Sequence, residues 1–293
     1  MVETSASRAH RSGPSFEPLR QTSVSRPLRV LLAEDNKINQ QFATLVLTNA
    51  GHSVEIAGNG REAVDALGRS DFDVVLMDIQ MPVLDGVQAT QEIRALPEPK
   101  GSIPIIAVTA HTMVGAREEY LAAGMNDYIA KPYKPSLLLA ALTKLTSRGA
   151  APIPVAVSQT PGEEVDAQID DLPVLDFEQL STLGLVFSAP KIRTLASLYV
   201  IDVEARLVLM GESRANNDFV GVSRQAHMIV STAGNLGAKQ SSAIAHSLEI
   251  SCVERNDLRA DQLITELRTS CALSSRAIRD WLSVEPTTHH GAG

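Results

Sequence analysis

Three carboxylates, a hydroxyl and an amine in this 293-residue chain could together perform phosphoryl chemistry. The carboxylates Glu34, Asp35 and Asp78 would repel one another if the fold gathered them, and Mg²⁺ relieves such repulsion with oxygen ligands. Asp78 would bind the metal and still attack phosphorus to form an acyl phosphate. The Lys131 ammonium would spread the charge of the transferring group, and Thr109 could donate a hydrogen bond to it. These residues predict a metal-assisted phosphoryl acceptor.

Short apolar segments place each of these residues at the end of an expected strand. The run from Val74 to Met77 is continuously apolar, which is typical of a strand buried on both faces, and it leads directly into Asp78. Considered alone, this stretch fits equally well an ordinary buried strand that is followed by a polar turn and has no functional role. Further strands are expected at 28–33, 53–57, 103–108 and 127–130. They alternate with helices: one follows the first strand and ends at Gly51, and the others cover 60–67, 87–96, 113–123 and 135–146.

This alternation defines the fold class of residues 28–147. Five strand–helix units imply an α/β domain with a doubly wound, parallel, five-stranded sheet of the flavodoxin-like kind. In such a sheet the carboxyl ends of the strands share one edge, where open α/β sheets bind their ligands. The ends of four strands would therefore bring the three acids, Thr109 and Lys131 into one crevice.

The second half of the chain has a different composition and only helical periods. Residues 148–173 are rich in Ala, Pro, Gly, Ser and acids without a sustained period, which predicts a flexible linker. Residues 174–284 then hold a short helix capped by Asp176 and four longer helices. The longer helices begin near Pro190, Asp218, Lys239 and Leu258. Their short connections favour an all-α, antiparallel four-helix bundle.

His227 stands out on the second of the four longer helices. The apolar stripe of this helix, predicted to face the bundle core, consists of Val222, Ala226, Ile229, Ala233 and Leu236. His227 lies one residue off the stripe, so its imidazole is expected at the helix surface, beside the small residues Ser231 and Gly234. Such a face lets the cleft of another protein approach, and neutral imidazole attacks phosphorus near a pH of about 7. A lone helical histidine is more often an ordinary surface residue, so the pattern alone leaves both readings open.

The composition argues against several classes of function. The net charge of −8 disfavours a basic surface for nucleic acid. No apolar run approaches the ~20 residues that span a bilayer, and the first 26 residues hold no apolar core of a secretory signal. Cys252 and Cys271 are expected to be reduced thiols of a cytoplasmic protein. Residues 1–27 and 285–293 are expected to be a disordered lead-in and a disordered tail.

Residues 28–147 resemble a response-regulator receiver domain. The resemblance rests on LLAEDN at 31–36, LMDIQMPVLDG at 76–86, VTA at 108–110 and GMNDYIAKP at 124–132, in the order and spacing of the family. It implies that Asp78 accepts a phosphoryl group. It also implies that Mg²⁺ is bound by Glu34, Asp35, Asp78 and the backbone carbonyl of Gln80.

The receiver resemblance assigns roles to the later motifs as well. Lys131 is implied to contact the phosphate, often beside a cis peptide at Pro132. Thr109 and Tyr128 are implied to form the conformational switch, although an aromatic residue such as Tyr128 is more often a packing residue when it is considered alone.

Residues 174–284 resemble a histidine phosphotransfer (HPt) domain, with His227 implied as the phosphoacceptor. The matching segments are the Ala-His pair at 226–227, AGNLGA at 233–238, LDFEQL at 175–180 and SLE at 247–249. The sequence departs from the family twice, because Val230 stands where a lysine is usual and Ser231 where a glycine leaves room for the docking receiver. Arg224, one turn before the histidine, could compensate for the missing charge, whereas Val230 could slow transfer.

Together the resemblances imply a two-component phosphorelay protein, similar to the carboxyl-terminal part of a hybrid sensor kinase or to a stand-alone relay protein. No kinase catalytic core is expected, and the implied partners are an upstream histidine kinase and a downstream response regulator. A phosphorylation-gated binding protein is the alternative, in which the bundle docks partners without transferring phosphate, and Val230 and Ser231 favour it. A metal-dependent hydrolase built on the same sheet is disfavoured.

Overall fold

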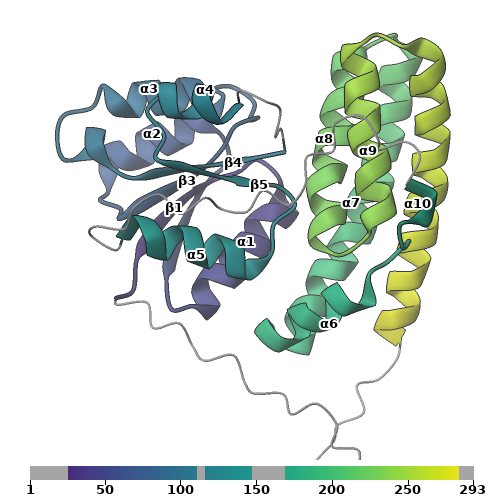
Figure 1. The fold of residues 1–293 in the computed structure, drawn as a ribbon, viewed down its shortest axis with the longest axis horizontal. Helices are drawn as coiled ribbons and strands as arrows, with labels where there is room; N and C mark the ends of the chain where they lie inside the picture. The colour runs from purple at the N-terminus through teal and green to yellow at the C-terminus, as the bar shows by residue number, and fades with distance from the viewer. Residues whose placement is uncertain (1–25, 111–115, 147–168, 284–293) are drawn as a thin grey trace, which may run out of the picture.

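The first domain is built on a five-stranded parallel sheet with the strand order β2-β1-β3-β4-β5. The computed structural model describes residues 26–110, 116–146 and 169–283 (Figure 1). The strands are β1 (Arg29–Ala33), β2 (Ser53–Ala57), β3 (Val74–Asp78), β4 (Ile105–Thr109) and β5 (Asp127–Ala130). Every residue of β3 and β4 is buried because these strands lie inside the sheet and are covered on both faces. The predicted doubly wound α/β fold is confirmed.

Helices cover both faces of this sheet (Figure 1). One face carries α1 (Lys37–Asn49) and α5 (Pro135–Thr146), and the other carries α2 (Gly60–Arg69), α3 (Gly86–Arg94) and α4 (Ala116–Ala122). Side chains of Asn36, Asn59 and Asp85 accept hydrogen bonds from backbone N–H groups in the first turns of α1, α2 and α3. A short 3₁₀ helix, η1 (Lys100–Ser102), precedes β4. We call residues 26–146 the sheet domain.

The second domain is a helical bundle of residues 169–283 (Figure 1). It contains η2 (Ile169–Asp171), α6 (Phe177–Val186), α7 (Ala189–Ala215), α8 (Phe219–Asn235), α9 (Lys239–Val253) and α10 (Asp257–Ser283). The four long helices close a ring, since α8 packs against α7 and α9, and α10 packs against the same two helices. The predicted core stripe of α8 is buried, with Val222, Ala226, Ile229 and Ala233 at 0% exposure. The expected four-helix bundle is confirmed, and we call it the bundle.

The two domains share one continuous hydrophobic core. Helix α1 of the sheet domain packs against α7 and α8. The Phe42 ring on α1 lies edge-on to Phe187 of the bundle at 6.2 Å and to Tyr133 of its own domain at 5.9 Å between ring centroids. Aromatic rings in this arrangement add directional contacts to the area they bury. The bundle is therefore held against the face of the sheet that carries α1.

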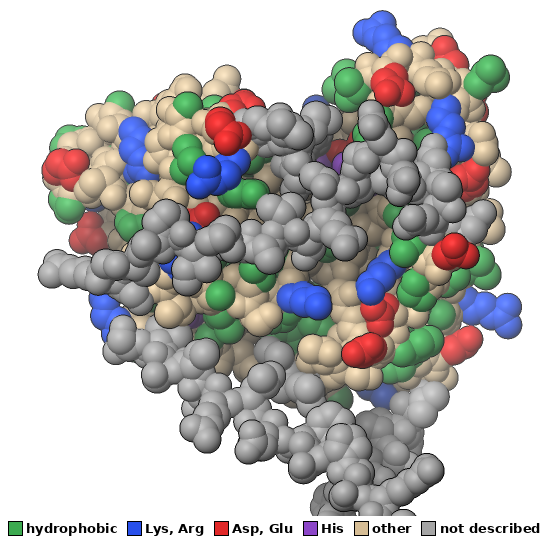
Figure 2. Space-filling view, viewed as in Figure 1, with side chains coloured by type: hydrophobic (Ala, Val, Ile, Leu, Met, Phe, Trp, Pro, Cys, Tyr) green, Lys and Arg blue, Asp and Glu red, His purple; other side chains and the backbone are tan. Residues whose placement is uncertain are grey.

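Charged side chains of both signs are interspersed over the visible face of both lobes (Figure 2). Among the helices of the described residues, none combines the length and the apolar character needed to cross a membrane. The predicted lead-in, linker and tail lie for the most part outside the described residues.

Candidate functional site

Glu34, Asp35 and Asp78 form an acidic cluster at the carboxyl ends of β1 and β3. One oxygen atom of each carboxylate lies within 4.8 Å of the corresponding atoms of the other two. Strands β1 and β3 pair in parallel with Ala33 opposite Met77, so the residues that follow share one edge of the sheet. Glu34 and Asp78 are buried and Asp35 is half-buried. The strand pattern predicted that the fold gathers these acids, and it does.

The backbone around Asp78 depends on a glycine. A Cβ atom on Gly86 at the start of α3 would overlap the carbonyl oxygen of Asp78. Gly86 donates its N–H to the carbonyl of Ile79, which closes the turn after β3. The missing side chain therefore lets α3 begin directly behind the acidic cluster.

Lys131, from the end of β5, lies between two of the acids. Its Nζ atom is 2.6 Å from Glu34 Oε2 and 2.6 Å from Asp78 Oδ2, and all three side chains are buried. Burial alone would lower the pKa of Lys131, but the Asp78 and Glu34 carboxylates hold this pKa above its ordinary value. Burial raises the pKa of Glu34, while Lys131 opposes the rise. The Lys131–Pro132 peptide is cis, as the receiver resemblance implies.

The acidic cluster offers the oxygen ligands that Mg²⁺ prefers. Asp35 Oδ1 is a buried oxygen with no hydrogen-bond partner among the described residues, so a cation would satisfy it. Burial raises the pKa of Asp35, and the neighbouring Glu34 carboxylate adds to that rise, which is the electrostatic strain that a divalent ion removes. The backbone N–H of Gln80 donates to Asp78 Oδ1 at 3.2 Å, so Gln80 lies directly beside the cluster. These residues fit a magnesium ion.

Thr109 ends β4 next to the acids, and a tyrosine that the sequence did not single out lies beside it. The Thr109 hydroxyl lies 3.1 Å from the hydroxyl of Tyr120 on α4, and both side chains are buried. Tyr128, which the resemblance implies to form the conformational switch with Thr109, is half-buried and packs on the core between the sheet and α2, α3 and α4. Tyr120 was missed from the sequence. A buried tyrosine hydroxyl usually finds a polar partner, and this was the only available signal.

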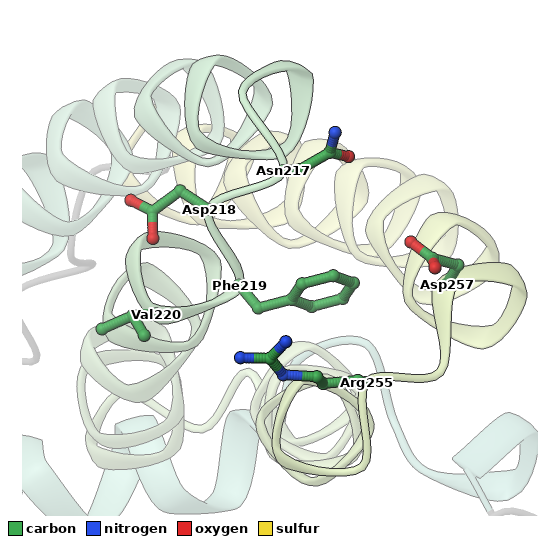
Figure 3. Close-up of a pocket in the computed structure, with 6 residues that line it drawn as sticks. All are labelled: Asn217, Asp218, Phe219, Val220, Arg255 and Asp257. Atoms are coloured by element: carbon green, nitrogen blue, oxygen red, sulfur yellow. The ribbon is translucent and has the colours of Figure 1, made fainter.

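A cleft of about 900 Å³ lies between the sheet domain and the bundle. The sheet domain lines it with Asp35, Gln80 and Met81 among others, and α8 lines it with Arg224, His227 and Met228. We call this space the interdomain cleft. It adjoins a second hollow of about 510 Å³ at the end of the bundle (Figure 3), because Phe219, Val220 and Arg255 line both.

His227 is buried, with 6% of its surface exposed, so the prediction of a surface imidazole is wrong. The predicted orientation of α8 is nevertheless confirmed, because the apolar stripe next to His227 faces the bundle core. The sheet domain provides the cover, since it forms the opposite wall of the interdomain cleft. The nearby His227 also lowers the pKa of Asp35, although this effect is smaller than that of burial. The structure thus places the histidine beside the acidic cluster of its own chain.

A carboxylate orients the imidazole of His227. Nδ1 of His227 lies 2.9 Å from Oε1 of Glu249 on α9, and both side chains are buried. His246 is half-buried, and its Nδ1 lies 3.5 Å from Glu249 Oε2. The role of Glu249 was not inferred from the sequence. The available signal was an acid directly after the inward-facing Leu248, because a buried carboxylate needs a partner.

The three residues that depart from or flank the HPt pattern have distinct surroundings. Val230 is 4% exposed and belongs to the hydrophobic core of the bundle. Ser231 is 1% exposed, and its hydroxyl accepts a hydrogen bond from Asn39 Nδ2 on α1 at 2.9 Å. Arg224 is exposed and lines the interdomain cleft on the same helix as His227. The valine therefore packs in the core, and the serine contacts the sheet domain.

Comparison with known families agrees with the two-domain division. A family model described as the response regulator receiver domain matches residues 30–143. A model described as the Hpt domain matches residues 194–281. Both matched ranges lie inside the domains that the structure shows.

Several known proteins are similar to parts of the chain. Sensor protein GacS of Pseudomonas syringae pv. syringae is 33% identical over 213 residues, covering 70% of this chain and 22% of that protein. Hybrid signal transduction histidine kinase I of Dictyostelium discoideum is 46% identical over 118 residues, covering 38% of this chain and 7% of that protein. The chain thus spans less than a quarter of the length of either relative.

A solved structure is also similar to the first domain. It is the receiver domain of a sensor histidine kinase from Pseudomonas aeruginosa PAO1 with a magnesium ion coordinated in the active site cleft. It is 44% identical and covers 40% of this chain and 95% of that chain, with a TM-score of 0.37.

Proposed function

This chain is a two-component phosphorelay protein, a receiver domain followed by an Hpt domain, and from that premise we propose that Asp78 and His227 are its two phosphoacceptors. Asp78 accepts a phosphoryl group from a phosphohistidine, and His227 passes phosphate to or from a receiver. One observation carries the proposal: the same cleft is lined by Asp35 of the acidic cluster and by His227. The acidic cluster that contains Asp78 and the imidazole of His227 thus border one space.

The first step occurs at Asp78. An Oδ atom of Asp78 attacks phosphorus, the P–O bond forms, and the P–N bond to the donor histidine breaks as its electron pair returns to the imidazole. Lys131, held 2.6 Å from Asp78 Oδ2, neutralises charge on the transferring group, and the Thr109 hydroxyl donates to a phosphate oxygen. Mg²⁺ held by Glu34, Asp35, Asp78 and the Gln80 carbonyl would supply electrostatic stabilisation of the phosphoryl oxygens.

The second step occurs at His227. The Glu249 carboxylate accepts the Nδ1–H hydrogen bond, so the proton stays on Nδ1 and the lone pair of Nε2 is the nucleophile. The same carboxylate stabilises the positive charge that forms when Nε2 bonds to phosphorus. Arg224, exposed on the same wall of the cleft, supplies positive charge where the family has a lysine. The core position of Val230 keeps it from competing with the imidazole for this space.

The proposed partners follow from the two phosphoacceptors. An upstream histidine kinase supplies phosphate to Asp78, and a downstream response regulator exchanges it with His227. In this proposal the chain carries phosphate in the cytoplasm without a kinase catalytic core of its own.

Phosphorylation of the full chain tests these assignments. A labelled phosphohistidine donor with Mg²⁺ should place base-labile label on Asp78 and acid-labile, base-stable label on His227. Asp78→Asn should remove both labels, and His227→Gln should remove only the base-stable label. Label that persists on Asp78→Asn would refute the first assignment. Label confined to Asp78 in the wild-type chain would refute the second and favour the gated binding protein.

A further inference from the structure

Three polar side chains join the bundle to the sheet domain next to the reacting groups. Asn39 on α1 donates to Ser231 Oγ at 2.9 Å, and Asn235 Nδ2 donates to Asn39 Oδ1 at 3.3 Å. Asn235 Oδ1 accepts from the backbone N–H of Tyr133 at 3.4 Å. All three side chains are 2% exposed or less. We call Asn39, Ser231 and Asn235 the asparagine clasp.

The surfaces around the asparagine clasp fit closely. A Cβ atom on Gly234 would overlap the ring of Pro132, so the backbone of α8 touches the loop that follows Lys131. Asn36 Nδ2 at the start of α1 lies 3.8 Å from the sulfur of Met228. The contact therefore runs along α8 on both sides of Ser231, one turn from His227, and it leaves no room for a larger residue at Gly234.

The asparagine clasp lies in the contact between the two docked domains, and its hydrogen bonds cross from α8 to Asn39 and to the backbone of Tyr133. Its amide and hydroxyl groups satisfy one another across the contact, so they favour this pairing over one with apolar residues. Ser231 replaces the glycine that is usual in HPt domains, and its hydroxyl is the acceptor that Asn39 uses. A receiver without an amide at the position of Asn39 would leave the buried hydroxyl without this donor. An HPt domain with glycine would leave Asn39 without this acceptor.

We propose that the asparagine clasp selects which receiver reaches His227, and that it selects the receiver of the same chain. This inference rests on the proposed function of Asp78 and His227. Phosphate then moves within one chain: the Asp78 Oδ–P bond breaks, the electron pair returns to the carboxylate, and the bond from His227 Nε2 to phosphorus forms. The Nδ1 proton remains in the hydrogen bond to Glu249, and the same atoms serve the reverse step.

The order of the transfer reaction tests the proposal directly. The full chain is labelled on Asp78 with a small labelled acyl phosphate and Mg²⁺, and the appearance of base-stable label on His227 is followed over a range of chain concentrations. Transfer within one chain gives a rate constant that does not depend on concentration. A mixture of the His227→Gln and Asp78→Asn chains, which permits transfer only between chains, should be at least about tenfold slower at low concentration.

Substitutions in the asparagine clasp test its residues. Ser231→Ala should slow transfer within the chain about tenfold, because it removes the acceptor and touches no acid of the Asp78 site. Asn39→Ala also removes the hydrogen bonds to Glu34 and from Asn235, so it should slow transfer at least as much. The double variant should be no slower than Asn39→Ala alone, since the bond lost in Ser231→Ala is already lost in Asn39→Ala. Asn49→Ala, an exposed asparagine at the far end of α1, is the matched control and should transfer at the wild-type rate.

Each outcome of these experiments decides the proposal. Labelling of Asp78 by the acyl phosphate is measured in parallel for each variant and reports whether its sheet domain is intact, and transfer to His227 is expressed per labelled Asp78. A wild-type rate that rises in proportion to concentration, or clasp variants that transfer as fast as Asn49→Ala, would overturn the selection by the asparagine clasp and leave the relay standing. Absence of label on His227 at every concentration would overturn the relay step and the clasp together.

Discussion

The Asp78 site and the His227 site are both buried, but different parts of the molecule bury them. The Asp78 site is assembled inside the sheet domain from four strand ends, and Lys131 holds its charges together. The His227 site is formed by one helix of the bundle, oriented by Glu249, and covered by the other domain. The first site is thus internally complete, whereas the second is complete only when the domains meet. Under the proposed function, the sheet domain that covers His227 is also its reaction partner, so the burial of the imidazole does not prevent phosphoryl transfer.

The largest effect that follows from this difference is on stability. Lys131→Met should lower the free energy of unfolding by about 3–5 kcal/mol, because it leaves the buried Glu34 and Asp78 carboxylates facing each other without a cation. Equilibrium urea unfolding of the chain without Mg²⁺ measures the loss. Lys144→Met is the matched control, since the pair of Lys144 with Asp127 is partly solvated and should contribute about 1 kcal/mol or less. Equal losses in both variants would show that the Lys131 pairs do not hold the site together.

The same pairs give the first site a pH signature. Because the pKa of Lys131 is raised above its ordinary value of 10.5, the stabilisation from its pairs is complete below that pH and is lost as the pH rises through the higher folded-state value. The difference in stability between the wild type and Lys131→Met should therefore be unchanged from neutral pH up to about 10 and shrink only above it. A difference that already shrinks near neutrality would contradict this assignment.

The second largest effect concerns the orientation of His227. Glu249→Ala should slow phosphorylation of His227 by about a hundredfold, because a misaligned imidazole rarely presents Nε2 to phosphorus. Labelling of Asp78 should be unaffected, which separates this effect from general unfolding. Glu249→Gln keeps an oxygen acceptor for Nδ1–H and should recover part of the rate. Equal rates in the Ala and Gln variants would indicate a packing role for Glu249 alone.

A smaller effect distinguishes the two tyrosines near Thr109. Tyr120→Phe should cost about 1 kcal/mol of stability, because it removes a buried hydrogen bond to Thr109. Tyr128→Phe is the matched control and should cost about 0.5 kcal/mol or less, since the Tyr128 hydroxyl makes no hydrogen bond to the described residues. Urea unfolding compares the two variants. A larger loss for Tyr128→Phe would contradict the assignment of the stabilising hydrogen bond to Tyr120.

The smallest effect concerns the pair of Asp176 with Lys239 in the bundle, which is more exposed than the buried pairs of Lys131. The Lys239 hydrogen bond lowers the pKa of Asp176, with a further contribution from the backbone N–H of Gln179. The resulting stabilisation is present above the ordinary value of 3.8 and is lost as the pH falls through the lower folded-state value. Asp176→Asn keeps the helix cap and should cost up to about 1 kcal/mol at neutral pH and almost nothing in strong acid. Thermal unfolding of the wild type and of Asp176→Asn from neutral pH to strong acid measures this cost. A stability loss in Asp176→Asn that persists in acid would show that the charge of Asp176 is not its cause.

The sequence was sufficient for the Asp78 site because topology alone brings its residues together. An apolar run ending in Asp78 and the strand ends before Glu34 and Lys131 converge in any parallel sheet of this order. The sequence also showed which face of α8 meets the bundle core. These features depend on local periodicity and on the connection rules of α/β folds, which a single chain displays.

The features that the sequence did not show depend on contacts between distant elements. The burial of His227 requires the cover of the sheet domain, which helical phase cannot report. The pairing of Glu249 with His227 spans two helices, and the contact of Tyr120 with Thr109 depends on where α4 lies against β4. Ser231 departs from the HPt pattern in the sequence, and only the structure shows that its hydroxyl has a specific partner on α1.

One amide group links the two sites. Asn39 Nδ2 donates to Glu34 Oε1 at 3.1 Å and to Ser231 Oγ at 2.9 Å, so a single NH₂ group touches both the acidic cluster and α8. Any ligand that draws Glu34 away from this amide changes the free energy of docking, and thermodynamic reciprocity requires docking to change the affinity for that ligand by the same factor. Loading of the acidic cluster and closure of the two domains should therefore behave as a cooperative pair of equilibria.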